Sequence, residues 1–176
     1  MVFAKLFKKK LEAKDYAGAL FQVFVIDKLE KTKYYEDYVE RWRNSPEFNE
    51  SKCAYVLYVY EVSVVLLALV AVAKKMPEFD KVFPHFREQA LEAVRKGLNV
   101  PEVTFDQDVS EAVRNLTTLI FTDPSKNFAL SFEWTSKWIA SFGAKDNNPI
   151  DLWTMAHLWK NSFNQLCRMF DEVKVI

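Results

Sequence analysis

The side chains best suited to chemistry are two histidines, His85 and His157, and two cysteines, Cys53 and Cys167. A carboxylate-bridged di-iron bundle uses Glu-x-x-His pairs on facing helices, but the residues three positions before these histidines are valine and threonine. His157 and Cys167 lie on one expected helix, about 15 Å apart along its axis, which is too far to share an ion or to act as base and nucleophile. The sequence therefore predicts neither a metal site nor a cofactor. A site that unites Cys53 with a histidine through the fold remains open.

Composition excludes several other classes of function. The chain has 24 basic and 24 acidic residues, so no net field favours a nucleic acid. Its three glycines lie too far apart for a phosphate-binding loop. Two cysteines are too few for a disulfide scaffold, which indicates a reduced, cytoplasmic protein. No enzyme motif is present, so a non-enzymatic function is favoured.

One carboxylate occupies an unusual place. Residues 53–73 contain only two polar side chains, Glu61 and Ser63. An isolated ionised carboxylate among apolar neighbours is costly, so Glu61 must be ion-paired, face a ligand pocket or lie at an exposed edge. A pocket there would be shared with Tyr58 and would bind an apolar small molecule. The cations that could instead form an ion pair from another helix include Arg87, Arg95 and Arg114.

Aromatic residues are abundant, with fifteen Phe, seven Tyr and five Trp. Over the expected helix at 124–142, helical spacing gives one face with Phe128 and Phe132 and a second face with Trp134 and Trp138. Such a helix either lies deep in the core or presents its second face to another molecule. Trp134 and Trp138 are therefore candidates for a homodimer interface or, alternatively, for contact with a flat apolar ligand.

The segment at residues 53–73 is also long enough to cross a membrane. Glu61 near its centre opposes that interpretation, because a charge there costs at least ~2.5 kcal/mol. The remaining helices also carry wide apolar faces that need a buried partner. We therefore expect no transmembrane span, and predict that this segment is the central helix of a soluble domain.

Start and stop signals divide the chain into helices. Ser45 and Pro46 predict the start of the central helix, at about 46–75, and Asp108 with Glu111 resembles a capping box. A basic helix is expected at residues 2–13. Either its apolar face packs on the core and its lysines face solvent, or it lies on an anionic membrane. The remaining helices are expected at about 15–29, 32–42, 84–96, 124–142 and 149–171, with a short one after Pro77.

These signals predict a single all-α domain, residues 1–176, with seven or eight helices around the central one. Its layout resembles that of globin-like sensor domains, an analogy of fold alone. The favoured function is a helical interaction or regulatory module that self-associates or binds another protein. The alternative is a carrier or sensor for an apolar small molecule near Glu61.

Overall fold

The computed structural model describes residues 12–31, 33–98, 100–122, 127–145, 148–170 and 175. The described residues form no β-strand, which confirms the all-α prediction. Helix α2, the π-helical turn η1 and helix α3 follow one another without a break. If they are counted as one helix, the described residues form seven helices. The elements are α2 (Ala13–Phe21), η1 (Gln22–Ile26), α3 (Asp27–Lys31), α4 (Lys33–Trp42), α5 (Glu50–Ala73), the 3-10 turn η2 (Pro77–Lys81), α6 (Val82–Gly97), α7 (Glu102–Phe121), α8 (Asn127–Ala140) and α9 (Pro149–Phe170).

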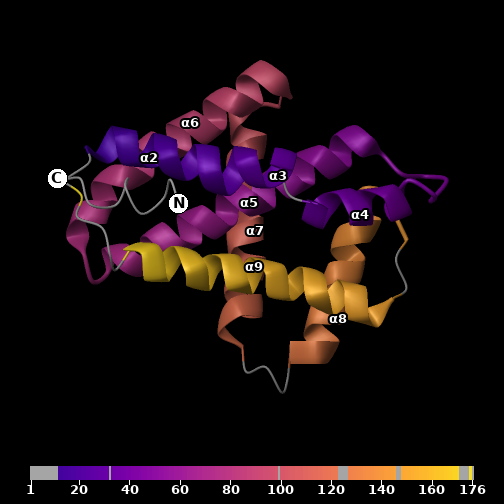
Figure 1. Ribbon diagram of the computed structural model, residues 1–176. Coiled ribbons are helices and arrows are strands. Elements are labelled where there is room, and N and C mark those ends of the chain that lie inside the picture. The colour runs from indigo at the N-terminus through magenta and orange to yellow at the C-terminus, as the bar shows by residue number, and fades with distance from the viewer. Residues whose placement is uncertain are drawn as a thin grey trace.

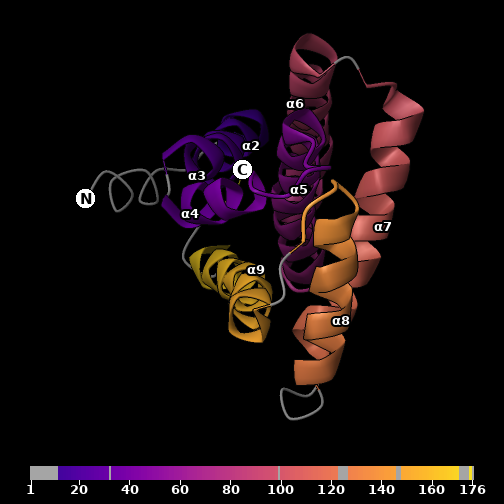
Figure 2. The ribbon, with the colours of Figure 1, turned by 90° about the vertical axis from the view of Figure 1, so that its right-hand side faces the viewer.

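Helix α5 is the centre of the molecule. It lies between α2–α4 and α9 on one side and α7 and α8 on the other (Figures 1 and 2). All side chains from residue 57 to residue 69 are buried, including Glu61 and Ser63. The helix is long and apolar enough to cross a membrane, but 78% of its most apolar window is buried inside the chain. This confirms the predicted central core helix.

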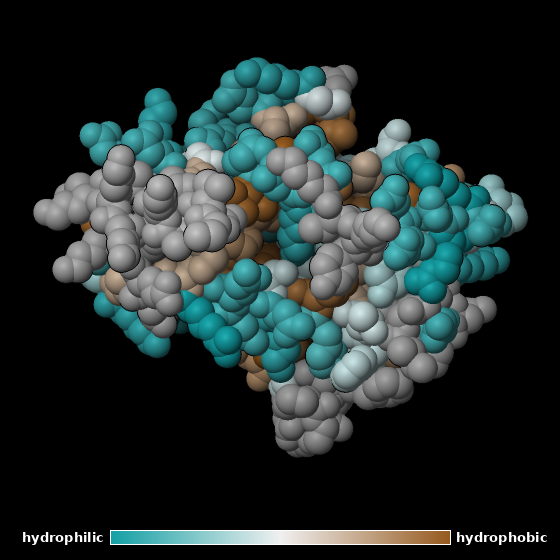
Figure 3. Space-filling view, in the orientation of Figure 1, coloured by the Kyte–Doolittle hydropathy of each residue, from teal (hydrophilic) through white to brown (hydrophobic). Residues whose placement is uncertain are grey.

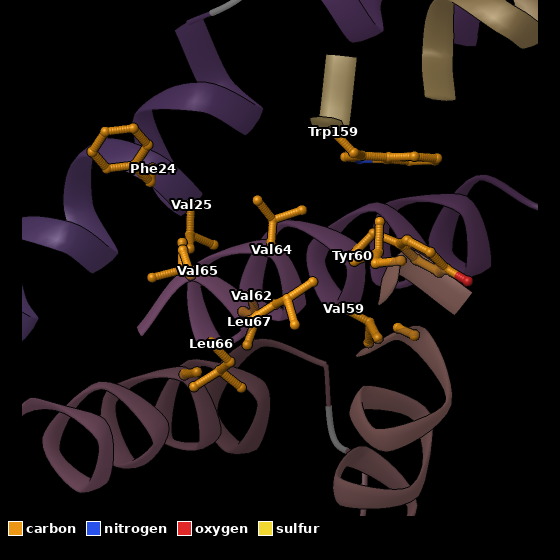
Figure 4. Close-up of a cluster of buried hydrophobic side chains, with 14 of the residues drawn as sticks. Phe24, Val25, Val59, Tyr60, Val62, Val64, Val65, Leu66, Leu67 and Trp159 are labelled. Carbon is orange, nitrogen blue, oxygen red and sulfur yellow. The ribbon is translucent and has the colours of Figure 1, made fainter. Parts of the chain in front are cut away.

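The burial of α5 follows from its sequence. Valines and leucines occur on every side of the helix, so no orientation on a surface could cover them all. Figure 4 shows these side chains leaving α5 in several directions; Phe24 and Val25 approach from η1 and Trp159 from α9. Each Val or Leu that is fully buried contributes about 1.5–3 kcal/mol, so surrounding α5 on all sides is strongly favoured.

The helices around α5 are amphipathic and direct their polar side chains outward. On the face formed by α2, α4 and α9, hydrophilic side chains cover most of the visible described surface, and hydrophobic patches show mainly in the seams between them (Figure 3). Residues 2–11 of the predicted basic helix lie outside the described residues, and Ala13 is instead the first residue of α2. The start of the helix expected at 124–142 also lies outside them.

The predicted start of α5 was wrong. The helix begins at Glu50, where the Asn49 side chain accepts a hydrogen bond from the backbone N–H of Lys52 at 2.9 Å. Ser45 instead accepts a bond from the N–H of Lys145 at 3.0 Å. The N–H of Asn49 also donates to the carbonyl of Phe142 at 2.9 Å. Residues 43–48 are therefore held as a turn against the loop after α8, and the helix starts later.

The predicted capping box at Asp108 and Glu111 was also wrong. Helix α7 begins six residues earlier, at Glu102 after Pro101, and runs through both residues without interruption. The Asp108 carboxylate is not a cap, because it accepts a hydrogen bond from the Tyr55 hydroxyl of α5 at 2.6 Å.

Candidate functional site

A cleft of about 480 Å³ lies between α5, α7 and α8 and is open on one side. Each helix contributes side chains three or four positions apart, which places them on one face of that helix. Ala112 of α7 is small and leaves room above α5. The lining residues are Lys52, Tyr55, Val56, Val59, Tyr60, Asp108, Glu111, Ala112, Asn115, Trp134, Lys137, Trp138 and Ser141.

Packed aromatic rings fix one wall of the cleft. The Tyr60 ring centroid lies 5.4 Å from Trp134 and 5.5 Å from Trp138, and the Trp159 ring packs behind it at 5.1 Å. Trp138 is 5% exposed, whereas Trp134 is half-buried at the cleft. Because these rings are held by core packing, the wall exists before any ligand arrives.

This packing bears on the predicted interface through Trp134 and Trp138. Trp138 is buried inside its own chain, where it also contacts the rings of Trp42 and Phe142. Trp138 is therefore a core residue of its own chain. A homodimer remains a prediction, and only Trp134 of this pair retains a partly open surface.

Two indole N–H groups in this cluster are buried without a hydrogen-bond partner among the described residues, those of Trp138 and Trp159. An unsatisfied buried donor costs about 1–3 kcal/mol. Burial and the Glu61 carboxylate raise the pKa of Tyr35, and the nearby Trp159 N–H opposes that rise, but without the geometry of a hydrogen bond. The cluster is thus held by ring packing rather than by polar contacts.

The rim of the cleft carries polar groups. The Asn115 amide lies 3.4 Å from the Tyr60 hydroxyl, a long hydrogen bond, and Lys137 is ion-paired with Glu133 at 2.6 Å. Burial raises the pKa of Tyr60 to about 12; the negative charge of Glu111 adds to the rise, and the Asn115 hydrogen bond opposes it. Tyr60 is therefore a neutral hydroxyl near pH 7.

Glu61 faces away from the cleft and is ion-paired. Its Oε2 lies 2.5 Å from Nζ of Lys28, and its Oε1 accepts a hydrogen bond from the Tyr35 hydroxyl. Lys28 also donates to the Ser162 hydroxyl at 2.8 Å. Glu61 is 1% exposed, so the exposed-edge alternative was wrong and the ion-pair alternative is confirmed.

The partner of Glu61 is nevertheless not one of the arginines that we considered. Arg87 pairs with Glu102 and Asp106, and Arg95 pairs with Glu88 and Glu102, on the molecular surface. Lys28 follows the π-helical turn, which inserts an extra residue into the helical repeat and changes the face on which later residues lie. Simple helical periodicity could not have placed Lys28 opposite Glu61.

Tyr58 does not share a pocket with Glu61. Its hydroxyl donates to the carbonyl of Ala90 in α6 at 2.7 Å, and its ring packs on Phe21 and Phe105. Neither Tyr58 nor Glu61 lines the cleft. A ligand site at Tyr58 and Glu61 stays a prediction, whereas the neighbouring Tyr60, on another face of α5, lines the cleft.

The histidines and cysteines remain apart. His85 is exposed on α6, and His157 packs on the Trp153 ring with Nδ1 at 3.0 Å from the Trp153 carbonyl oxygen. Burial raises the pKa of Cys53 to about 12, which keeps it a thiol rather than a nucleophilic thiolate. Within the described ranges, no group of His, Cys, Asp and Glu is placed to hold a metal ion.

Comparison with protein-family models, with curated proteins and with solved structures gave no match.

Proposed function

We propose that this chain is a small-molecule-binding protein, a carrier or sensor, and that its ligand lies in the cleft between α5, α7 and α8. The observation that carries the proposal is the cleft itself: about 480 Å³, with an aromatic wall, an apolar floor and a few polar groups at the rim. Ligand sites in proteins have this size and composition. The site is thus moved from Glu61, where the sequence suggested it, to the Tyr60 face of α5.

Several features support binding rather than catalysis. A tyrosine hydroxyl is neutral near pH 7, and burial moves the pKa of both Tyr55 and Tyr60 further above the usual value near 10. Neither histidine lines the cleft, and neither does a cysteine. Neither Cys53 nor Cys167 forms a disulfide, as is usual in the reducing cytoplasm, and we include that location in the proposal.

The test is a titration with indole, a neutral flat probe, followed by amide chemical shifts in NMR spectra. We expect shifts at Val59, Tyr60, Asn115 and Trp134. Val56→Phe should fill the cleft and abolish them, whereas Val70→Phe, at an exposed position on the same helix, should leave them unchanged. Shifts located elsewhere, or shifts that survive Val56→Phe, would contradict the proposal.

A second candidate is the self-associating interaction module that the sequence favoured. It is supported by two exposed apolar side chains at the adjoining ends of α7 and α8: Phe121 is 62% exposed and Leu130 is 48% exposed. Spectra without indole at two protein concentrations test it. Self-association through these residues would shift the signals of Phe121 and Leu130 as the concentration rises.

A further inference from the structure

The two ends of the cleft carry different charges. Lys52 lies in the first turn of α5, and Tyr60 lies eight residues further along the same helix, about 12 Å away at 1.5 Å per residue. Glu111 and Asn115 of α7 accompany Tyr60: Asn115 is hydrogen-bonded to its hydroxyl, and the charge of Glu111 acts on its pKa. Lys52 thus lies at one end of the cleft, and Glu111 lies with the aromatic rings at the other.

The other two charged groups at the rim already have partners, although the hydrogen bond from the neutral Tyr55 hydroxyl leaves the negative charge of Asp108 in place. Asp108 accepts a hydrogen bond from Tyr55 at 2.6 Å, and Lys137 is paired with Glu133 at 2.6 Å. Lys52 and Glu111 have no ion pair with any residue that the structure describes. Among the charged groups of the rim, the Lys52 ammonium and the Glu111 carboxylate are therefore the two that no hydrogen bond or ion pair with a described residue occupies.

The Glu111 end also offers an aromatic surface. Trp134 and Tyr60 meet at an interplanar angle of 51°, and Trp134 is only half-buried. Aromatic faces beside a carboxylate attract both flat rings and organic ammonium groups. This end is suited to the cationic, aromatic part of a ligand.

We infer that the ligand is an aromatic zwitterion of about dipeptide size. Its ammonium would lie at Glu111 and Asn115, its ring against Trp134 and Tyr60, and its carboxylate at Lys52. Two extended residues span about 7 Å, and the long side chain of Lys52 covers the remaining distance. The inference rests on the proposed function, because it assigns a ligand class to the same cleft.

The test uses one molecule with each charge removed separately: tryptophyl-glycine, its N-acetyl derivative, its C-terminal amide, and the form with both changes. Binding to the full chain is measured by NMR titration. We expect the zwitterion to bind best and each lost charge to weaken it by about two- to fivefold, as for solvent-exposed ion pairs.

Two variants connect each charge of the ligand to one residue. For the Glu111→Gln variant, acetylation of the ligand should no longer weaken binding, while amidation should still weaken it. For the Lys52→Gln variant, amidation should no longer weaken binding, while acetylation should still weaken it. Lys52 and Glu111 are both exposed, so the fold should persist in either variant. Lys75→Gln, at an exposed position two residues after the other end of α5, is the matched control.

The outcomes separate this inference from the proposed function. If all four forms bind equally, or if the doubly blocked form binds best, the zwitterion inference is wrong, while indole binding in the cleft still supports a small-molecule site. If neither indole nor any form of the dipeptide shifts the cleft residues, both are wrong.

Discussion

At the scale of single residues, Glu61 is the clearest case in which burial and charge compete. Its carboxylate sits inside the most apolar helix of the chain, yet both oxygens are occupied, one by Lys28 and one by Tyr35. Burying such a pair gains little net stability, because desolvation offsets the attraction. Removing one partner, however, leaves an uncompensated charge in the core.

We therefore predict that Glu61→Ala lowers the free energy of unfolding by about 3 kcal/mol, the lower end of the range for broken buried pairs, since Lys28 is partly exposed. Urea unfolding at pH 7 measures this. Tyr35→Phe should cost less, about 1–3 kcal/mol, because it removes only a hydrogen-bond donor.

The matched control replaces both charges, as Lys28→Met with Glu61→Leu. With no isolated charge left, this double variant should be more stable than Glu61→Ala. If Glu61→Ala unfolds at the same urea concentration as the wild type, the ion pair contributes nothing and the prediction is wrong.

The sequence could show that Glu61 needs a partner, but not which one. Lys28 and Tyr35 are 33 and 26 residues away, and the π-helical turn before Lys28 leaves no signature in the hydrophobic pattern. The cleft could not be predicted from the sequence either. Periodicity placed Trp134 and Trp138 on one face of their helix, but which neighbour covers that face depends on the packing of α5, α7 and α9.

At the scale of elements, the helix boundaries show where tertiary contacts override the local sequence signals. Ser45 followed by Pro46 is as good a helix start as Asn49, judged from sequence alone. The hydrogen bonds from Asn49 to Phe142 and from Lys145 to Ser45 decide between them, since they hold the two loops together. Such contacts join residues far apart in the sequence and cannot be inferred from local spacing.

These two loops make Gly143 sensitive to substitution. Gly143 has φ of 78°, and a Cβ built on it would lie 1.9 Å from the carbonyl oxygen of Glu47. Gly143→Ala should therefore strain the backbone and push the loops apart, with a loss of more than about 1 kcal/mol of unfolding free energy. Thermal and urea unfolding measure the loss.

Gly97 is the matched control. It is the last residue of α6, and a Cβ there meets nothing within 4 Å. Gly97→Ala should be neutral or stabilise the protein by up to about 1 kcal/mol, because alanine loses less entropy in a helix. If both variants behave alike, the close contact with Glu47 has no energetic consequence.

At the scale of the whole molecule, the all-α fold and the central helix were predictable for one reason. A helix that is apolar on every side needs cover on every side, and the amphipathic helices elsewhere in the chain supply it. The order in which they surround α5 was not predictable, because many arrangements satisfy the same hydrophobic pattern.

The same central packing predicts an alkaline limit to stability. Burial raises the pKa of Tyr16, Tyr35 and Tyr58 above the usual value near 10, and that of Cys53 to about 12. Above about pH 9–10 the unfolded chain loses these protons while the folded chain keeps them. The unfolded state then binds fewer protons, so the free energy of unfolding should fall as pH rises.

Urea midpoints measured at pH 8, 9.5 and 10.5 check this expectation. They should agree up to about pH 9 and then decline. Tyr58→Phe removes one of the hydroxyls whose pKa is raised, so the decline should become shallower. The same substitution also removes the hydrogen bond to the Ala90 carbonyl. A midpoint that is constant up to pH 10.5 would contradict the assignment.

The position of α5 in the chain also matters during synthesis. The helix is complete at residue 73, but α9, which covers one of its sides, is complete only at residue 170. Ribosomes add about 5–20 residues per second, so the side of α5 that α9 covers stays open for roughly 5–20 s. During that interval the nascent chain presents the same apolar surface that chaperones and the membrane-targeting machinery recognise. We expect α6 and α7, which contact α5 and are complete by residue 121, to cover their sides of the helix earlier and to leave only the side of α9 exposed.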